Sequence, residues 1–334
     1  MLWHGPPPCK RSNPMSRYVT KRLLQALVII FFVSLIIFVI INLAPGDPYT
    51  QRMDPSVSAE RKQEILQKMG YYDPIHIKYV KWVRDAIRGD FGYSIKYKKP
   101  VFDVIMDYLP NTLLLGGAAL LLSTVIAIPA GITSSTKRNS LFDYLGTIFS
   151  FVGISIPAFF FGLLMIKWFA FDLRIFPISG MVTVGKSATG WAHIADVARH
   201  LVLPTIVLAL LQTATLMRYT RSSMLEVYDQ DYIRTARAKG LPESKVIHRH
   251  AFKNALIPII TVLSIRIPTI FSGAVLTETI FVWPGIGRLS YQAILDRDYP
   301  LIMALLLMTT VMILLCNLIA DILYAFVDPR VRYE

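Results

Sequence analysis

The sequence predicts an all-α polytopic membrane protein, and three observations lead to that prediction. The 334-residue chain is 54% hydrophobic and 17% charged, whereas soluble domains are about 45–50% apolar and about 25% charged. Six apolar runs are long enough to be transmembrane helices, which need about 20 residues each. The formal net charge of +13 comes largely from Lys and Arg beside these runs, which favours a role in membrane orientation over nucleic-acid binding.

The N-terminal region divides at Met15. Residues 1–14 are Pro-rich and lack periodicity, so we expect a disordered tail or a leader foreign to the native protein, whose start would be Met15. Residues 15–43 comprise a basic lead-in and the first apolar run, Leu23–Leu43. No small-residue cleavage site follows this run, so we interpret it as a retained span and not as a signal peptide.

Residues 110–327 contain the other five runs and form the predicted membrane core. These runs are Asn111–Ile132, Tyr144–Phe171, Leu201–Tyr219, Ala255–Ile280 and Leu301–Val327. Pro157 interrupts the third run, and Pro258 and Pro268 lie within the fifth. Prolines are tolerated in spans where neighbouring groups satisfy the freed backbone atoms, so we expect six transmembrane helices in total.

Basic residues beside the spans predict the orientation. They precede the first span, separate the second from the third and the fourth from the fifth, and recur in the tail 328–334. All of these positions fall on one side if six helices alternate, and the positive-inside rule assigns that side, with both termini, to the cytoplasm. The loop 44–109 is then external. It carries eleven basic and nine acidic residues, but loops of this length are translocated largely regardless of charge.

The external loop is predicted to fold. Ser58 can cap a helix that ends at Gly70, and Pro74 suits the first turn of a second helix that ends before Gly89. The expected apolar faces of these two helices are Ile65, Leu66 and Met69, and then Tyr79, Val83 and Ile87. The sequence therefore predicts an external subdomain between the first two spans.

A basic segment between the fourth and fifth spans, within residues 220–255, is a candidate docking surface. It has helical character up to Lys239, and then Gly240 and Pro242 predict a sharp stop before a second helical run. We therefore expect a short helix, a turn and a second helix at the membrane face. The alternative is an ordinary basic loop.

Several motifs carry a resemblance to a known family. The spacing of Ala236 and Gly240 is similar to the Ala-x-x-x-Gly core of the EAA loop in bacterial ABC importer permeases of the dipeptide/oligopeptide/nickel branch. The sequence departs from the full pattern at Arg234 and Thr235, and its Leu-Ile-Pro258 lies further from the Gly. Five further segments resemble the same branch: Pro45–Pro48, Arg88–Ser94, Leu109–Leu113, Phe176–Gly180 and Thr277–Gly287.

This resemblance implies a type I ABC importer permease fold and a transport subunit that is not itself an enzyme. It further implies a path for di- or oligopeptides formed with a second homologous permease in the bacterial inner membrane, with nickel as the alternative solute. The implied partners are two ABC ATPase subunits, which would bind ATP and Mg²⁺, and an extracytoplasmic peptide-binding protein; the chain would bind no cofactor or nucleic acid. A self-contained channel is a rival of another class.

By the same resemblance, the segment after the fourth span is a coupling helix that docks in a groove of the ATPase. Its candidate residues are Asp231, Tyr232, Arg234, Thr235, Ala236, Arg237, Ala238, Lys239 and Gly240. Because Ala236 lies one turn before Gly240, we expect both small residues on the docking face. A charge at either position should then disrupt docking and leave membrane insertion intact.

Two charged residues in the fifth apolar run are candidates for the translocation path. Intramembrane charges are costly and are often functional. Arg266 is expected to face a watery cavity or to pair with a neighbouring subunit. Glu278 is expected either to line the path or, as the alternative that we favour, to hold the turn at Trp283–Gly285 by hydrogen bonds.

Residues 180–187 match the phosphate-loop pattern G-x-x-x-x-G-K-S. A true phosphate loop follows a buried strand and opens a helix, whereas this one follows a predicted span and is expected outside the cell. We therefore do not expect nucleotide binding there. His248 and His250 lack a third candidate ligand nearby, so we predict no metal site, and no catalytic group is predicted.

Overall fold

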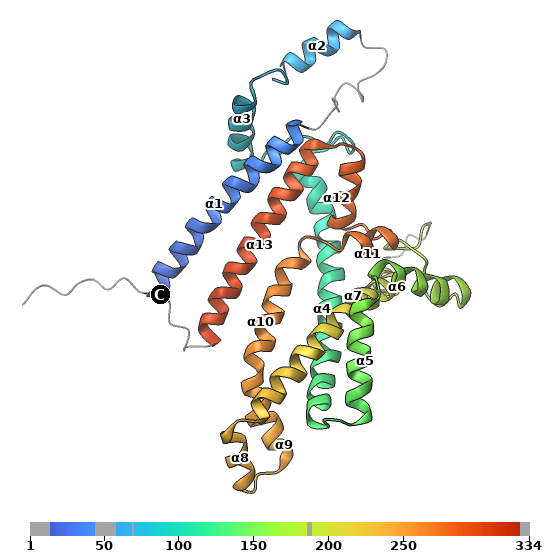
Figure 1. Cartoon of the computed structure of the whole chain (residues 1–334). Coiled ribbons are helices and arrows are strands. Elements are labelled where there is room, and N and C mark those ends of the chain that lie inside the picture. The colour runs from blue at the N-terminus through green and yellow to red at the C-terminus, as the bar shows by residue number, and fades with distance from the viewer. Residues whose placement is uncertain (1–13, 44–57, 69, 186–188, 328–334) are drawn as a thin grey trace, which may run out of the picture.

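The structure is a computed structural model that describes residues 14–43, 58–68, 70–185 and 189–327. Within these ranges every regular element is helical (Figure 1), and the extended segments contribute one isolated bridge between Tyr93 and Pro100. The elements are α1 Pro14–Leu43, α2 Ala59–Lys68, α3 Ile75–Ile87, α4 Val101–Thr136, α5 Leu141–Ser155, α6 Ala158–Met165, η2 Ile166–Asp172, α7 Trp191–Tyr228, α8 Asp231–Ala238, α9 Glu243–Lys245, η3 Val246–Phe252, α10 Lys253–Ile270, α11 Val275–Ile280, α12 Ile286–Leu295 and α13 Tyr299–Val327.

Five of the described helical segments are long and apolar enough to cross a membrane, and a bent pair can supply a sixth. The five are Val19–Leu43, Val101–Thr136, Trp191–Tyr228, Glu243–Ile270 and Tyr299–Asp321. The prediction of an all-α chain with six spans is confirmed if the bent pair counts as one span. Some spans are longer than their apolar runs; α4, for example, begins at Val101, before the predicted start at Asn111.

The third apolar run is not one straight helix. Its two halves, α5 and the α6–η2 segment, meet at an angle of 102°. Pro157 lacks an N–H and disfavours the helical conformation of the residue before it, and Ile156 is accordingly extended, with ψ at 123°. In Figure 1, α6 therefore projects sideways from the bundle instead of continuing the direction of α5.

The fifth apolar run also breaks, so the prediction of one span over Ala255–Ile280 is wrong. The helix ends at Ile270, and α11 begins at Val275. Between them Gly273 has φ of +73°, and a Cβ built there would lie 2.4 Å from the backbone nitrogen of Gly287. Only glycine permits both this conformation and this close approach. Pro258 and Pro268, by contrast, remain inside α10.

Helices α4 and α7 form the centre of the bundle, with α5 and α10 packed on α7. Gly131 lets the central pair approach closely, because a Cβ there would lie 2.6 Å from Cβ of Thr220. Helix α1 lies at the edge of the bundle against α13 (Figure 1). An ion pair of 3.2 Å between Arg22 and Asp321 joins these two helices.

The two helices predicted within the loop 44–109 are present as α2 and α3. Ser58 Oγ accepts the Arg61 N–H at 3.3 Å and so caps α2, and Gly70 follows this helix with φ of +74°. Helix α3 packs on α1, where the Tyr79 hydroxyl lies 2.8 Å from Ser34 Oγ. The expected apolar faces are only partly right, because Ile87 is 82% exposed. Met69 lies outside the described residues.

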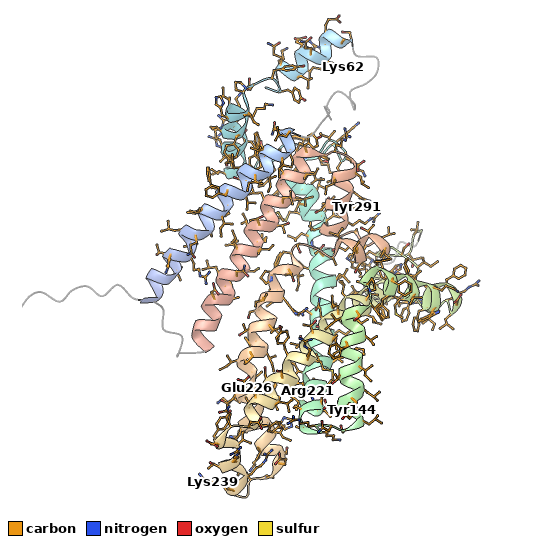
Figure 2. All side chains as sticks on the ribbon, viewed as in Figure 1. Lys62, Tyr144, Arg221, Glu226, Lys239 and Tyr291 are labelled. Carbon is orange, nitrogen blue, oxygen red and sulfur yellow. The ribbon has the colours of Figure 1, made fainter. Side chains whose placement is uncertain are left out.

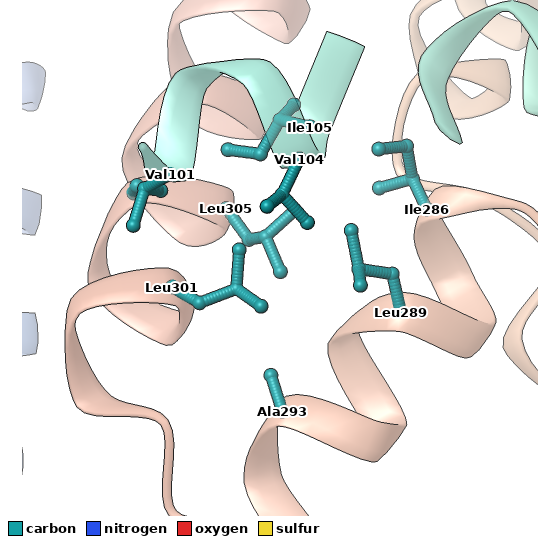
Figure 3. Close-up of a cluster of buried hydrophobic side chains, with 9 residues drawn as sticks. Val101, Val104, Ile105, Ile286, Leu289, Ala293, Leu301 and Leu305 are labelled. Atoms are coloured by element: carbon teal, nitrogen blue, oxygen red, sulfur yellow. The ribbon is translucent and has the colours of Figure 1, made fainter. Parts of the chain in front are cut away.

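An apolar cluster joins α4, α12 and α13 at the end of the bundle nearest α3 (Figure 3). Its members are Val101, Val104, Ile105, Ile286, Leu289, Ala293, Leu301, Ala304 and Leu305. Phe91 packs against it. Nearby, Ser94 Oγ donates to Asp298 Oδ2 at 2.5 Å across 204 residues of sequence. The segment before α4 that contains Phe91 and Ser94 is thus packed against the core.

Candidate functional site

Helix α8, the turn at residues 239–242 and the α9–η3 segment after it form the helix–turn–helix hairpin expected from the sequence, which is called the α8 hairpin below. Asp231 lies in the first turn of α8, where a carboxylate interacts favourably with the helix dipole. The Gly240 N–H donates to the Arg237 carbonyl at 2.9 Å, and Gly240 has φ of +73°. A Cβ at Gly240 would meet no atom within 4 Å, so the backbone conformation alone requires glycine there. Figure 2 shows Lys239 at the far tip of the hairpin.

Ala236 does not lie on the outer face, so that part of the prediction is wrong. Ile233 and Ala236 are three residues apart on one side of α8, and they are 0% and 5% exposed. They pack with four further residues of the hairpin and the adjoining helices, Met224, Val246, Ala251 and Ala255. The exposed candidate residues are Asp231, Tyr232, Arg234, Thr235, Arg237, Ala238, Lys239 and Gly240.

Arg237 closes the hairpin internally although its side chain is also exposed. Its Nε and Nη2 atoms donate to the two Glu243 carboxylate oxygens at 3.2 and 2.8 Å. The guanidinium carbon also lies 5.5 Å from the centre of the Tyr228 ring. The hydrogen bonds to Glu243 raise the pKa of Arg237. A polar cavity of about 220 Å³ adjoins this pair and extends to Ser135 and Arg138.

Glu278 is enclosed by hydrogen-bond donors and is 1% exposed. Its Oε1 accepts from Thr112 Oγ1 at 3.1 Å and from the Ala274 N–H at 3.2 Å. Its Oε2 accepts the Arg288 N–H at 2.9 Å, and its own carbonyl accepts the Trp283 N–H at 2.8 Å. These contacts support the interpretation of Glu278 as the residue that holds the turn after α11. Its carboxylate also forms part of the wall of a cavity of about 260 Å³.

The segments 109–113 and 277–287, singled out separately in the sequence, lie against each other. Trp283 Nε1 donates to the Asn111 carbonyl at 2.9 Å, and Asn111 Nδ2 donates to the Pro284 carbonyl at 2.9 Å. The Ile286 N–H donates to Thr112 Oγ1 at 2.6 Å. A Cβ at Gly285 would lie 2.5 Å from the Glu278 carboxylate, so a glycine is required for the two segments to close on Glu278.

Arg266 lies near the end of α10, within a membrane-spanning segment, and its side chain is half-buried. Among the described residues its guanidinium makes no hydrogen bond or ion pair. The Tyr219 hydroxyl on α7 has an electrostatic effect on this guanidinium. The structure therefore separates the two candidate path residues, because Glu278 is fully engaged and Arg266 is not.

The described part of residues 180–187 lacks the surroundings of a phosphate loop. The preceding helical element ends at Asp172, no strand occurs in the ranges that the structure covers, and the next helix begins only at Trp191. Thr183 instead donates from both its N–H and its hydroxyl to the Asp196 carboxylate. Lys186 and Ser187 lie outside the described residues. Across the described chain, no group of three metal-binding side chains lies close enough to hold a metal ion. His248 and His250 therefore belong to no such group among these residues.

A buried ion pair between Asp143 and Arg221 was missed by the sequence reasoning. Arg221 donates from Nε and Nη2 to the two Asp143 oxygens at 2.6 and 2.9 Å, and Ser134 Oγ donates to Oδ1 at 2.5 Å. The pair joins α5 to α7 across 78 residues of sequence. Part of it was detectable, because Ser140 caps α5 by accepting the Asp143 N–H, and a Ser three residues before an acidic side chain marks a helix start.

Comparison with known proteins gives a consistent result. Residues 127–333 match the family described as "Binding-protein-dependent transport system inner membrane component", and residues 15–116 match its N-terminal counterpart. The oligopeptide transport system permease AppB of Bacillus subtilis is 44% identical over 320 residues, which cover 96% of this chain and 100% of the relative. The dipeptide permease DppB of Escherichia coli K12 is 35% identical with the same coverage.

A third relative, the di/tripeptide permease DppB of Pseudomonas aeruginosa, is 38% identical over 339 residues. Among solved structures, an inward-facing MetNI methionine ABC transporter is similar with a TM-score of 0.54 and 15% identity. That match covers 67% of this chain and 96% of the other chain. At this identity the structural likeness supports the fold alone.

Proposed function

This chain belongs to the family of binding-protein-dependent transport system inner-membrane components, and from that premise we propose that it forms the membrane path of an ATP-driven importer of di- or oligopeptides. The observation that carries the proposal is the similarity to three peptide permeases at 35–44% identity along 96% of this chain. These relatives favour peptide over nickel as the solute. A second, homologous permease would complete the path.

The α8 hairpin is the proposed contact with the ATPase subunits, which would bind ATP and Mg²⁺ in place of this chain. Supporting the proposal, the hairpin protrudes from the bundle (Figure 1). The polar side chains of α8 are exposed, and its apolar side packs against α7 and α10 through Met224 and Ala255. Because of this packing, a displacement of α8 by the ATPase would also displace α7 and α10. The exposed Tyr232, Arg234 and Lys239 are the proposed contact residues. Ala236 lies on the opposite, buried side of α8 and packs the helix against the bundle.

The proposed orientation places α8 in the cytoplasm and α2–α3 on the opposite side, where a peptide-binding protein would dock. Figure 1 places these two parts at opposite ends of the bundle, and the α4–α5 turn that carries Lys137 and Arg138 lies at the α8 end. Basic residues near spans favour the cytoplasmic side. Both termini would then be cytoplasmic, in a bacterial inner-membrane protein.

Reconstitution tests this proposal. The chain would be co-expressed with its second permease, its ATPases and its binding protein, placed in proteoliposomes, and supplied with radiolabelled Ala-Phe or radioactive Ni²⁺. We expect ATP-dependent accumulation of the dipeptide that unlabelled tripeptide competes away, with no accumulation of Ni²⁺. Nickel uptake without dipeptide uptake would show that the transported solute is nickel and not a peptide. Uptake by this chain alone, without ATP, would favour a channel.

A further inference from the structure

Helices α7 and α10 pack on each other, and within their membrane-spanning segments both have side chains that the rest of the described chain leaves exposed, a region called here the open side. Tyr219 on α7 is 47% exposed, and Ile265 and Ile267 on α10 are 65% and 45% exposed. Arg266 lies between these two isoleucines in the sequence, and the Tyr219 hydroxyl has an electrostatic effect on its guanidinium. A guanidinium that faces lipid within a membrane-spanning segment would be costly, so this side of the bundle is expected to meet water or another polar group.

Among the described residues Arg266 has no ion-pair partner, and three carboxylates within or beside the spans, Asp143, Asp321 and Glu278, have partners of their own. Asp143 accepts two hydrogen bonds from Arg221, and Asp321 pairs with Arg22. Glu278 accepts from Thr112 and from backbone N–H groups. Tyr219 makes no hydrogen bond through its hydroxyl within the described residues. A cation and a hydroxyl donor are thus left together on the open side, and both can bind an anion.

We propose that Arg266 and the Tyr219 hydroxyl bind the C-terminal carboxylate of a peptide as it passes through the membrane. This inference rests on the proposed peptide-import function and names the group that the path recognises. An importer that accepts peptides of varied sequence can read only what they share, and the terminal carboxylate is one such group. A guanidinium binds a carboxylate with charge-assisted, often bidentate hydrogen bonds.

The local surroundings suit a transient site. Arg266 is only half-buried, so the carboxylate would keep part of its hydration, and a path requires binding that is weak enough for release. Close to Arg266 the helix ends, and Thr269 and Ser272 hydroxyls donate to backbone carbonyls within the last turn. The cavity of about 260 Å³ beyond them is lined by Gln212, Thr269 and Ser272 among others, which continues the polar surface toward α11.

The test compares radiolabelled Ala-Phe with Ala-Phe-amide, which lacks the carboxylate charge, in proteoliposomes that hold the complete transporter. Both peptides are supplied at concentrations that saturate the binding protein, so that its own preference does not limit the rate. For Arg266→Gln we expect uptake of Ala-Phe to fall about tenfold or more, the factor that loss of a charged hydrogen bond gives, toward the rate of the amide. Uptake of the amide should not change.

Arg266→Lys should restore most of the uptake of Ala-Phe, because it retains the charge, and Tyr219→Phe should lower it by a smaller factor. Arg218→Gln is the matched control: Arg218 precedes Tyr219 on α7 but lines a separate cavity with Ser134 and Thr147, so both peptides should be transported as in the wild type.

Three results would overturn the inference. They are unchanged uptake of Ala-Phe by Arg266→Gln, an equal loss for both peptides that Arg266→Lys does not rescue, and loss of the second permease from the purified Arg266→Gln complex, which would indicate an ion pair between subunits. If the wild-type transporter moved no peptide at all, the proposed function itself would fail, and that result is distinct from all three.

Discussion

Thr112 donates its hydroxyl proton to Glu278 at 3.1 Å and accepts the Ile286 N–H at 2.6 Å, so one side chain of α4 bridges two segments that lie more than 160 residues further along the chain. This contact closes the turn after α11 around a carboxylate. The stability of that end of the bundle should therefore depend on the acceptor oxygens of Glu278.

Glu278→Gln should lower the thermal stability of the purified protein. The amide nitrogen replaces one acceptor oxygen and then faces N–H or hydroxyl donors in a site that is 1% exposed, which we expect to cost about 1–3 kcal/mol. The measurement is the melting temperature in detergent, with Glu226→Gln on the exposed end of α7 as the control. Equal melting temperatures for the two variants would contradict the structural role of Glu278.

Arg221→Met should destabilise the protein more than Arg218→Met. The first change leaves the Asp143 carboxylate, with 5% side-chain exposure, without its ion-pair partner, whereas Arg218 is exposed. Breaking a buried pair costs about 3–5 kcal/mol, and we expect the lower end because the Arg221 side chain is 30% exposed. Figure 2 shows Arg221 at the end of the bundle that carries α8. Identical unfolding curves would show that the pair adds little.

Ala236→Asp should impair folding of the hairpin as well as docking. The new carboxylate would be buried among Ile233, Met224 and Val246 without a partner, at a cost of about 2 kcal/mol or more. Lys239→Asp reverses a charge at the exposed tip and should leave the fold intact. The readouts are the yield of monodisperse permease and the amount of ATPase that co-purifies. We expect Ala236→Asp to lower both and Lys239→Asp to lower only the second.

Normal yield with Ala236→Asp would contradict the inward packing of α8. Normal ATPase recovery and uptake with Lys239→Asp would instead argue against the hairpin tip as a contact. The two variants therefore test the support of the helix and its outer surface separately.

The orientation is tested by single cysteines at Tyr93 and Ser244 in a chain without its native cysteines. Tyr93 is 68% exposed, whereas the neighbouring Ser94 is buried against Asp298 and would react poorly from either side. An impermeant thiol reagent added to intact cells should label Tyr93→Cys and leave Ser244→Cys unlabelled until the membrane is opened. The reverse pattern would invert the proposed topology.

Lys186→Ala should leave ATP-driven peptide uptake near the wild-type rate. The segment before Lys186 lacks a strand–loop–helix arrangement, so no phosphate is expected to depend on that lysine. Uptake and ATP hydrolysis of the reconstituted complex are the measurements. Loss of ATP hydrolysis by the Lys186→Ala variant in an intact complex would contradict the proposal that only separate ATPase subunits bind and hydrolyse ATP.

The sequence by itself determined the features that depend on local chemistry. Apolar runs predict spans because about 20 residues cross the bilayer wherever they occur. Ser58 predicts a helix start, and Gly240 predicts a helix end, because capping and positive φ act within a few residues. The motifs also pointed to the family to which the chain belongs. None of these features requires knowledge of a distant contact.

Only the tertiary structure decided what depends on residues far apart. The side of α8 that carries Ala236 turns inward because Met224 and Ala255 lie there, and the chain breaks at Gly273 because Gly287 approaches it. The partners of Glu278 and Asp143 lie 166 and 78 residues away. Composition cannot tell an engaged charge from an open one. Only the packing separated Glu278, which holds a turn, from Arg266, which has no counter-charge among the residues that the structure describes.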